Sequence, residues 1–485
     1  MSLAFVFLGC SSNGSSGGGA DTGGSNATGG GSPSSGGAGP AGTGGASSAT
    51  GGANGGSQGG AGGAAGGATG GSSATGGSNA SGGAAGGGAG GASVADASVT
   101  PDAVAPSSDA ASRDGASTEA ATVAPPFTAS YHVGADITWV QHDEMYGATY
   151  VDTDGVAKDI LTVLKNHGFN SVRMRIYVDP KATDGYDKVD GFGDLAHTVL
   201  MGQRLKQAGM GFYLAMHYSD NWADPGKQCV PVAWQGDTTL AQLQTHVHDY
   251  TLNVMSTLKA AGAMPNLVQV GNEITPGMLI HLCDANGIPI TTGNNINPVN
   301  GRANNAAGWV NLGNLLKSAI QAIKEVDTTV KIVLHIDKGN NLATSVSWIQ
   351  NAMAQNVPFD VFADTSYVRW QPQPADWRNT FTMLATMFPT LSFVIPEYGN
   401  ETATNPPTPS TMRIANDLIF GLPNNRGIGT WFYEPEHPGQ AGIGIGLVQT
   451  NRTDAGISDP WPVFTMLPDA MTIYDQMKTA YSGRL

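Results

Sequence analysis

The stretch Leu267-Val268-Gln269-Val270-Gly271-Asn272-Glu273 decides the fold. Its apolar, largely β-branched residues predict a short buried strand, which stops at Gly271 and leaves Asn272 and Glu273 at its carboxyl end. The stretch Leu391-Ser392-Phe393-Val394-Ile395-Pro396-Glu397 has the same form and also ends on a glutamate. Because parallel barrels carry their functional residues at the carboxyl ends of their strands, both glutamates are candidate site residues.

Short apolar runs alternate with amphipathic stretches on both sides of these two strands. Eight such strand and helix units in order predict an α/β fold, a (β/α)8 TIM barrel. A long connection at 275–305, rich in Asn, Gly and Pro, is typical of a functional loop. We expect strands at 131–137, 170–177, 210–217, 267–273, 330–335, 359–367, 391–397 and 427–433. We expect helices at 154–167, 194–208, 240–261, 310–326, 346–355, 377–388, 412–420 and 470–481.

A low-complexity segment precedes the barrel. It is almost entirely Gly, Ala, Ser, Thr and Asn up to about Ser93, and then Ala, Asp, Ser, Thr and Pro up to Pro126. Such a segment has too little apolar surface to offset the entropy of ordering, so we predict a long disordered Gly/Ser/Ala-rich linker. The predicted organisation is an apolar, signal-like start at 1–10, this linker at 11–126 and the barrel domain at 127–485.

The apolar start ends in Leu8-Gly9-Cys10. It is similar to the end of a bacterial lipoprotein signal, in which the cysteine is lipidated, although no basic segment precedes it. We therefore expect an exported protein, either secreted or anchored at the cell surface through Cys10. The alternative is an apolar start whose cysteine is incidental.

Charge and cysteine content exclude some classes of partner. A net charge of −15 argues against binding to nucleic acid, and no apolar run has the length of a membrane span. Cys229 and Cys283 each follow a predicted strand, so both would lie on the same face of the barrel. Export would allow a disulfide, and two free thiols are equally compatible with the sequence. The absence of a Cys-x-x-Cys spacing argues against a structural zinc site.

Polar and aromatic side chains also follow the other predicted strands. Aromatic rings pack against the apolar faces of sugars while polar groups bind their hydroxyls, so this set predicts a carbohydrate-binding cleft. Any one of these residues could equally be a core residue, and the prediction depends on their shared location. The candidate residues are Asp136, Arg173, Arg175, His217, Trp222, His335, Tyr367 and Tyr433.

Glu273 and Glu397 then form a pair of carboxylates in that cleft. Two carboxylates on either side of a glycosidic bond are the machinery of glycoside hydrolysis: one donates a proton to the leaving oxygen and the other attacks the anomeric carbon. The alternative is that each glutamate stabilises a helix N-terminus or pairs with an arginine.

Four segments carry a resemblance to a known family. They are similar to segments of the arabinogalactan endo-β-1,4-galactanases, glycoside hydrolase family 53, over nearly all of 131–482. The segments are Gly134-Ala135-Asp136-Ile137, Ser171-Val172-Arg173-Met174-Arg175-Ile176-Tyr177, the run from His217 to Gln228 (His-Tyr-Ser-Asp-Asn-Trp-Ala-Asp-Pro-Gly-Lys-Gln) and Val268-Gln269-Val270-Gly271-Asn272-Glu273.

The resemblance implies an endo-acting, retaining hydrolase of β-1,4-galactan, with Glu397 as nucleophile and Glu273 as acid/base. Asn272 would bind the sugar 2-hydroxyl, and Arg173 would lie against the nucleophile and favour its ionised form. The remaining residues implied at the cleaved bond are His217, His335 and Tyr367. We expect the carboxyls about 5–5.5 Å apart. We also expect a polysaccharide substrate, a monomer, no cofactor and no metal.

Two departures from the family pattern concern specificity. Ser366-Tyr367-Val368-Arg369-Trp370 stands where the family usually has Ser-Tyr-Tyr-Pro-Phe, and Tyr433 stands where it usually has a tryptophan. Both catalytic glutamates are kept. The departures leave open a related barrel hydrolase acting on another β-linked polysaccharide. From a different class, a catalytically silent carbohydrate-binding protein would keep the cleft.

Overall fold

The computed structural model describes residues 130–399, 409–436, 446–450 and 463–485. The predictions for residues 1–10 and 11–126, including the lipid anchor at Cys10, lie outside the described residues.

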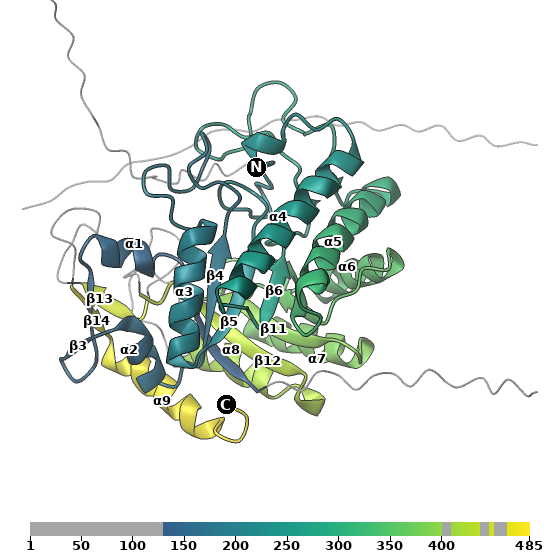
Figure 1. The fold of residues 1–485 in the computed structure, drawn as a ribbon. Coiled ribbons are helices and arrows are strands. Elements are labelled where there is room, and N and C mark those ends of the chain that lie inside the picture. The colour runs from purple at the N-terminus through teal and green to yellow at the C-terminus, as the bar shows by residue number, and fades with distance from the viewer. Residues whose placement is uncertain (1–129, 400–408, 437–445, 451–462) are drawn as a thin grey trace, which may run out of the picture. The chain divides into compact units, whose positions relative to one another are not determined.

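A closed barrel of eight parallel strands forms the centre of the described part, as predicted (Figure 1). Each strand pairs with its neighbours in parallel; Val361, for example, lies opposite Val333 on one side and Ser392 on the other. Going round the barrel, the strands are β1 (His132–Asp136), β12 (Gly427–Tyr433), β11 (Ser392–Tyr398), β10 (Val361–Asp364), β9 (Lys331–Ile336), β6 (Leu267–Val270), β5 (Gly211–Met216) and β4 (Ser171–Ile176).

A small hydrophobic cluster, separate from the main core, consists entirely of residues of the barrel strands. Trp431 is its largest member and is fully buried. A Cβ at Gly134, on the neighbouring strand β1, would lie 2.1 Å from the Trp431 ring, so this position has no room for a larger residue. The cluster consists of Tyr213, Leu267, Val333, Val361, Ala363, Val394, Ile428 and Trp431.

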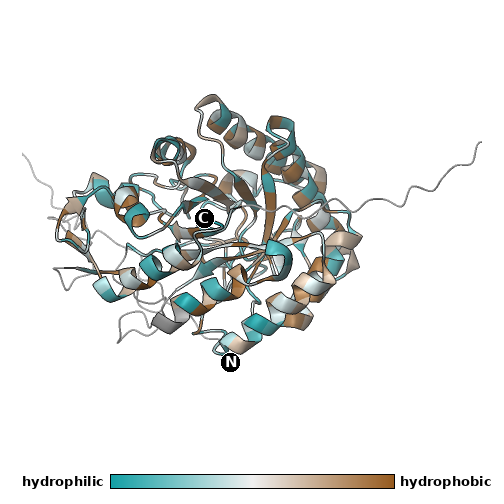
Figure 2. Ribbon diagram, turned by 90° about the horizontal axis from the view of Figure 1, so that it is seen from below, coloured by the Kyte–Doolittle hydropathy of each residue, from teal (hydrophilic) through white to brown (hydrophobic). Residues whose placement is uncertain are grey.

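Helices surround the barrel, with their apolar sides toward the strands and their polar sides outward (Figure 2). Several begin at a side chain that accepts a hydrogen bond from the first turn; Thr239 and Gln242 form a complete capping box. The helices are α1 (Val140–Met145), α2 (Ile160–Asn166), α3 (Leu195–Ala208), α4 (Leu240–Ala260), α5 (Ala306–Val326), α6 (Leu342–Ala354), α7 (Pro374–Met387), α8 (Pro409–Phe420) and α9 (Pro468–Ala480), with short 3-10 turns at Val232–Trp234 and Pro423–Asn425.

The region before α2 differs from the prediction. A helix was expected from residue 154, but α2 begins at Ile160 and a small sheet precedes it. Strand β2 (Thr149–Val151) pairs with β14 (Val463–Met466), about 300 residues later in the chain, and that pairing is invisible to a local periodicity. The other strands of this sheet are β3 (Ala157–Lys158) and β13 (Val448–Thr450).

Strand β10 is shorter than predicted, and the long connection at 275–305 has structure of its own. Strand β10 ends at Asp364, so Tyr367 lies in the loop beyond it and not in the strand. The long connection at 275–305 contains a short two-stranded sheet of β7 (Gly277–Met278) and β8 (Gly301–Arg302).

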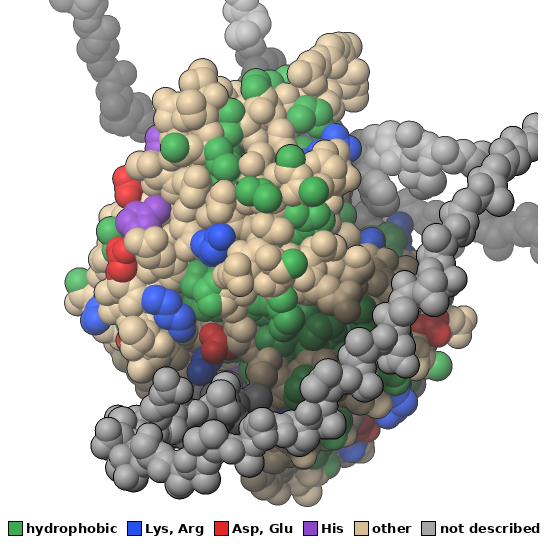
Figure 3. Space-filling view, turned by 90° about the vertical axis from the view of Figure 1, so that its right-hand side faces the viewer, with side chains coloured by type: hydrophobic (Ala, Val, Ile, Leu, Met, Phe, Trp, Pro, Cys, Tyr) green, Lys and Arg blue, Asp and Glu red, His purple; other side chains and the backbone are tan. Residues whose placement is uncertain are grey.

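The face drawn in Figure 3 carries few charged side chains, in keeping with a chain of which 13% is charged. On the face drawn in Figure 3, hydrophobic side chains are interspersed with polar side chains and backbone. No helix in the described ranges combines the length and the apolar character needed to cross a membrane.

Candidate active site

A cleft of about 520 Å³ opens at the carboxyl ends of the barrel strands. Of the residues proposed from the sequence, three lie beneath its floor and are fully buried: Asp136, Arg173 and His335. The others line it directly: Arg175, His217, Trp222, Asn272, Glu273, Tyr367, Glu397 and Tyr433. The fold therefore brings all eleven predicted site residues to one end of the barrel.

Glu397 lies on β11 and is held by a cation. Its Oε1 is 2.9 Å from Nη2 of Arg173, and the Tyr367 hydroxyl lies 3.4 Å from its Oε2. Burial raises the pKa of Glu397, while Arg173 and the Tyr367 hydroxyl lower it. The guanidinium therefore favours the ionised carboxylate that a nucleophile requires.

Glu273 follows β6 in a different environment. Its Oε1 lies 2.8 Å from the Thr365 hydroxyl, and no ion pair to it is present among the described residues. Burial raises the pKa of Glu273 well above its usual range, and the neighbouring Glu397 and Asp337 raise it further. The protonated acid is therefore the favoured form of Glu273.

The backbone at Glu273 is in an uncommon conformation. Its φ is +47°, in the left-handed region, three residues beyond the end of β6. Tyr218 after β5 and Glu434 after β12 share this feature, with φ of +52° and +46°. Strained backbone often occurs at functional sites, and of these three residues Glu273 lines the cleft.

Arg173 connects the two sides of the cleft. Its Nη1 donates to Asp136 at 2.5 Å, and its Nη2 donates to Asn272 Oδ1 at 2.9 Å as well as facing Glu397. Charge-assisted hydrogen bonds hold both Nη atoms of this buried arginine among two carboxylates and an amide, and its position fixes theirs; its Nε has no hydrogen-bond partner among the described residues.

Arg175 supports the aromatic wall. Its guanidinium pairs with Glu434 at 2.6 Å and donates to the Tyr433 hydroxyl at 2.7 Å. It also lies 5.4 Å from the Trp222 ring centre and 4.9 Å from that of Tyr433. Trp222 and Tyr433 thus present their rings to the cleft from fixed positions.

His217 faces the cleft as a neutral donor. Its Nδ1 accepts from the backbone N–H of Ala223 at 3.0 Å, so in the neutral ring the proton is on Nε2. Burial, followed by the charge of Arg173, lowers the pKa of His217 well below its usual value. Its Nε2, which has no hydrogen-bond partner among the described residues, can donate to a sugar hydroxyl.

A disulfide joins Cys229 to Cys283, with their Cα atoms 5.8 Å apart. Of the two alternatives that the sequence left open, the structure has the bonded form. The bond ties the loop after β5 to the loop after β6, which begins at Asn272 and Glu273.

A model of glycosyl hydrolase family 53 matches residues 132–406, more than half of the chain. The chain belongs to glycosyl hydrolase family 53. This confirms the predicted family and the predicted class of enzyme, a glycoside hydrolase.

The relatives of this family 53 chain include an arabinogalactan endo-β-1,4-galactanase of Thermothelomyces thermophilus, 28% identical over 334 residues, or 64% of this chain and 91% of that protein. An uncharacterised protein of Niallia circulans is 36% identical over 241 residues, 50% of this chain and 60% of its own length. A solved fungal β-1,4-galactanase superposes with a TM-score of 0.58 at 22% identity, over 72% of this chain and all of its own. That likeness confirms the barrel fold.

Sequence analysis of this family 53 chain missed two residues of the site. Gln269, inside β6, donates to Asn272 Oδ1 at 2.8 Å and accepts from Tyr213 at 2.8 Å. Thr365, just after β10, contacts Glu273. A glutamine in the middle of the apolar stretch 267–270 was the available signal for the first, whereas Thr365 lay inside a strand that was drawn too long.

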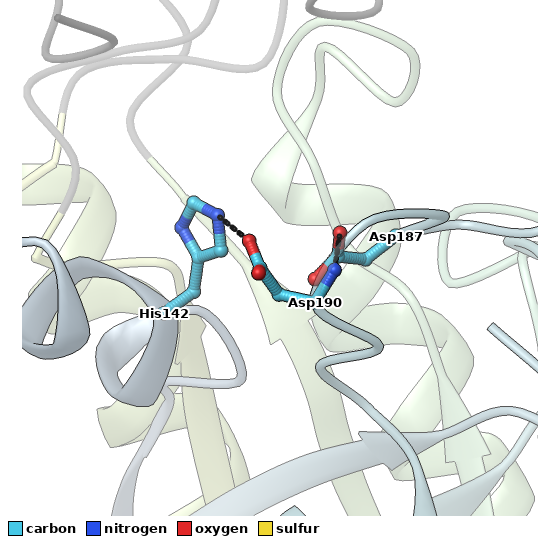
Figure 4. A group of neighbouring side chains, drawn as sticks. All are labelled: His142, Asp187 and Asp190. Atoms are coloured by element: carbon cyan, nitrogen blue, oxygen red, sulfur yellow. Dashed lines mark hydrogen bonds and ion pairs between the residues drawn. The ribbon is translucent and has the colours of Figure 1, made fainter. Parts of the chain in front are cut away.

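One group of side chains in this family 53 chain has the composition of a metal site. The ligand atoms of His142, Asp187 and Asp190 lie within 4.8 Å of one another, as Figure 4 illustrates. Asp190 accepts from the Tyr146 hydroxyl at 2.6 Å, and Asp187 accepts from the backbone N–H of Phe192 at 2.9 Å. These hydrogen bonds account for the positions of both aspartates without an ion.

Proposed function

We propose that this protein is an endo-acting, retaining hydrolase of β-1,4-galactan, the galactan of type I arabinogalactan. Glu397 attacks the anomeric carbon and Glu273 protonates the leaving oxygen; Glu273 then activates the water that releases the glycosyl-enzyme intermediate. The single observation that supports these roles is the unequal environment of the two carboxyls. Glu397 lies 2.9 Å from a buried arginine, whereas Glu273 has a neutral hydroxyl and acidic neighbours.

The other groups of the cleft have corresponding tasks in the proposal. Asn272 is held by Arg173 and Gln269 and binds the sugar 2-hydroxyl. The rings of Trp222 and Tyr433 stack on sugar faces along the cleft. Asp136 holds Arg173 in place beneath the nucleophile.

The disulfide supports an exported site of action, since disulfides persist in oxidising compartments. We therefore propose that the protein acts outside the cell on a polysaccharide, as a monomer whose cleft is formed by one chain. Size-exclusion chromatography with light scattering of the purified protein tests the monomer; a stable dimer would contradict it.

The deciding experiment is release of reducing sugar by the purified full chain on linear β-1,4-galactan, beside arabinan, xylan, mannan and cellulose. Rapid appearance of short galacto-oligosaccharides from galactan alone is expected. Activity on another polymer instead would indicate that Arg369, Trp370 and Tyr433 have changed the specificity. Binding to galactan without any product would indicate a carbohydrate-binding protein.

The stereochemical outcome needs its own measurement. Proton NMR of the first products distinguishes the β-anomer expected from double displacement from the α-anomer of single inversion. Initial release of the α-anomer would overturn the role of Glu397 as nucleophile.

A further inference from the structure

A line of hydrogen bonds runs behind Glu273, away from the cleft. The Glu273 Oε1 lies 2.8 Å from Thr365 Oγ1, which lies 2.7 Å from Nε2 of His335. The Nδ1 of His335 lies 3.0 Å from Asn272 Oδ1. His335 and Thr365 are buried, so the donors and acceptors of this line can be deduced from their neighbours.

The orientation of the Asn272 amide is fixed from two sides. Its oxygen faces Nη2 of Arg173 at 2.9 Å, and an arginine can only donate. Its nitrogen faces the backbone carbonyl of Ala223 at 2.9 Å, which can only accept. The atom that faces His335 is therefore the Asn272 oxygen, an acceptor.

The tautomer of His335 follows from this orientation. Its Nδ1 must carry a proton in order to donate to Asn272. Burial, together with the charge of Arg173, lowers the pKa of His335 well below its usual value, so the ring is neutral and Nε2 has no proton. Nε2 is then an acceptor, and it accepts from the Thr365 hydroxyl.

The Thr365 hydroxyl has a single proton, which it donates in the hydrogen bond to His335 Nε2. The remaining 2.8 Å contact of Thr365 with Glu273 can be a hydrogen bond only if the carboxyl supplies the proton. We propose that Thr365 accepts the acid proton of Glu273 while donating to His335, and so holds the general acid in its protonated form and fixes the direction of that proton. This inference rests on the proposed role of Glu273 as acid/base; in it Thr365 is a positioning residue.

The hydrogen bonds of Thr365 change when Glu273 loses and regains its proton during the proposed reaction. When Glu273 gives its proton to the leaving oxygen, its carboxylate and His335 Nε2 compete for the one Thr365 proton, and one of them is left without a donor. The hydroxyl rotates between the two acceptors without losing its proton. When Glu273 takes a proton from the attacking water, the original arrangement returns, ready for the next cycle.

The other charged groups around Glu273 also favour its protonated form, or are cations that pair with neighbouring carboxylates. Glu397, Asp337 and Asp224 each raise the pKa of Glu273. Two lysines and one arginine lie close to these carboxylates rather than to Glu273 itself: Lys338 near Asp337, Lys227 near Asp224 and Arg173 near Glu397. The opposite direction, in which the Thr365 hydroxyl donates to an ionised Glu273, lowers the pKa of Glu273 because charge-assisted hydrogen bonds are strong. The two directions predict opposite effects of removing the hydroxyl.

The first test is nitrogen NMR of the full chain labelled with ¹⁵N-histidine. His335→Gln assigns the His335 signals among those of the ten histidines. We expect a neutral His335 ring with the proton on Nδ1, and an Nε2 signal that changes with the ionisation of Glu273. In Thr365→Val that pH dependence disappears. A proton on Nε2 in the resting protein would overturn the proposal, and this test needs no substrate.

The second test is the pH dependence of kcat/KM. Thr365→Val removes the acceptor of the acid proton, so we expect the basic limb to move down by roughly 0.5–1 pH unit. Thr365→Ser restores the wild-type limb. Thr380→Val is the matched control, since Thr380 is a buried threonine of α7 whose hydroxyl has no hydrogen-bond partner among the described residues.

The outcomes separate this inference from the proposed function. A basic limb that moves up in Thr365→Val, or that does not move, overturns the inference while leaving Glu273 as acid/base. Full hydrolysis by Glu273→Gln overturns the proposed function, and the nitrogen spectra then still report the hydrogen-bond direction on their own.

Discussion

Glu273 and Glu397 are the same side chain at the ends of two strands of one barrel, yet their surroundings are opposite. Glu397 faces the guanidinium of Arg173 at 2.9 Å, and the Tyr367 hydroxyl lies at 3.4 Å. Glu273 faces the hydroxyl of Thr365, and burial and three acidic groups raise its pKa. The comparison shows how a barrel separates two carboxyls into a base-like and an acid-like partner: one receives a cation and the other does not.

The comparison predicts a pH window. In the proposed mechanism, activity requires Glu397 ionised and Glu273 protonated, so we expect activity to be lost as pH falls through the pKa of Glu397 and as pH rises through the pKa of Glu273. Because Glu273 has the more strongly raised pKa, the window between the two is open. Substitutions can remove one of the two carboxyls or change the environment of one of them.

The largest effect is expected from Glu397→Gln. It removes the proposed nucleophile, so we expect kcat on galactan to fall by about 10⁴-fold or more. The loss applies equally to an aryl galactoside with an activated leaving group, because that substrate also needs the attack. Thermal unfolding should confirm that the variant is folded, and near-normal turnover on either substrate would refute the assignment.

Glu273→Gln is expected to have the next largest effect, and a selective one. Removing a general acid costs about 10² to 10⁴-fold on polymer, whose leaving group needs a proton. The first step on an activated aryl galactoside should be nearly unaffected, and added azide should accelerate turnover by replacing the activated water. Equal losses on both substrates would mean that the two carboxyls do not have separate roles.

The fold was predictable from sequence to the extent that it depends on local pattern. The eight barrel strands follow from short apolar runs, and β12 has the bounds expected, Gly427–Tyr433. The small sheet that holds β2 was not predictable, because β2 pairs with residues about 300 positions away. Lys158, which binds Asp152 and Asp154, belongs to this sheet and lay in a stretch that also fits the start of a helix.

The candidate site likewise has a part that the local sequence predicts and a part that it does not. The positions of the two glutamates were predictable because each follows a strand, and the family motifs supplied the roles proposed for Asn272 and Arg173. The contacts that distinguish the glutamates come from other strands: Arg173 from β4 and Thr365 from beyond β10. Their distances depend on the closure of the barrel, which no linear pattern encodes.

Arg173→Lys keeps both carboxyls but changes the environment of Glu397. A lysine cannot contact Asp136, Asn272 and Glu397 together as the guanidinium does, so the pKa of Glu397 rises. Because a higher pH is then needed to ionise Glu397, we expect the acid limb of kcat/KM to move to higher pH and activity near neutral pH to fall by roughly 10-fold or more.

Arg175→Lys is the matched control for that variant. Arg175 is also buried on β4 and lies 3.4 Å from Asp136, but its nearest carboxylate is Glu434 and not Glu397. We expect a smaller movement of the acid limb. An acid limb that stays in place in Arg173→Lys would show that the arginine does not set the ionisation of the nucleophile.

The smallest effect is expected at the rim, where neither carboxyl is in contact. Trp370 is 46% exposed, lines the cleft and packs edge-on against Tyr367 at 5.2 Å between ring centres. Trp370→Ala removes a stacking surface, so we expect KM for long galactan to rise about 3–10-fold with kcat changed less than about 2-fold. Trp309→Ala, in α5 and away from the cleft, should leave KM unchanged. A fall in kcat at constant KM would contradict this prediction. It would indicate that Trp370 supports the chemical step by holding Tyr367 against Glu397.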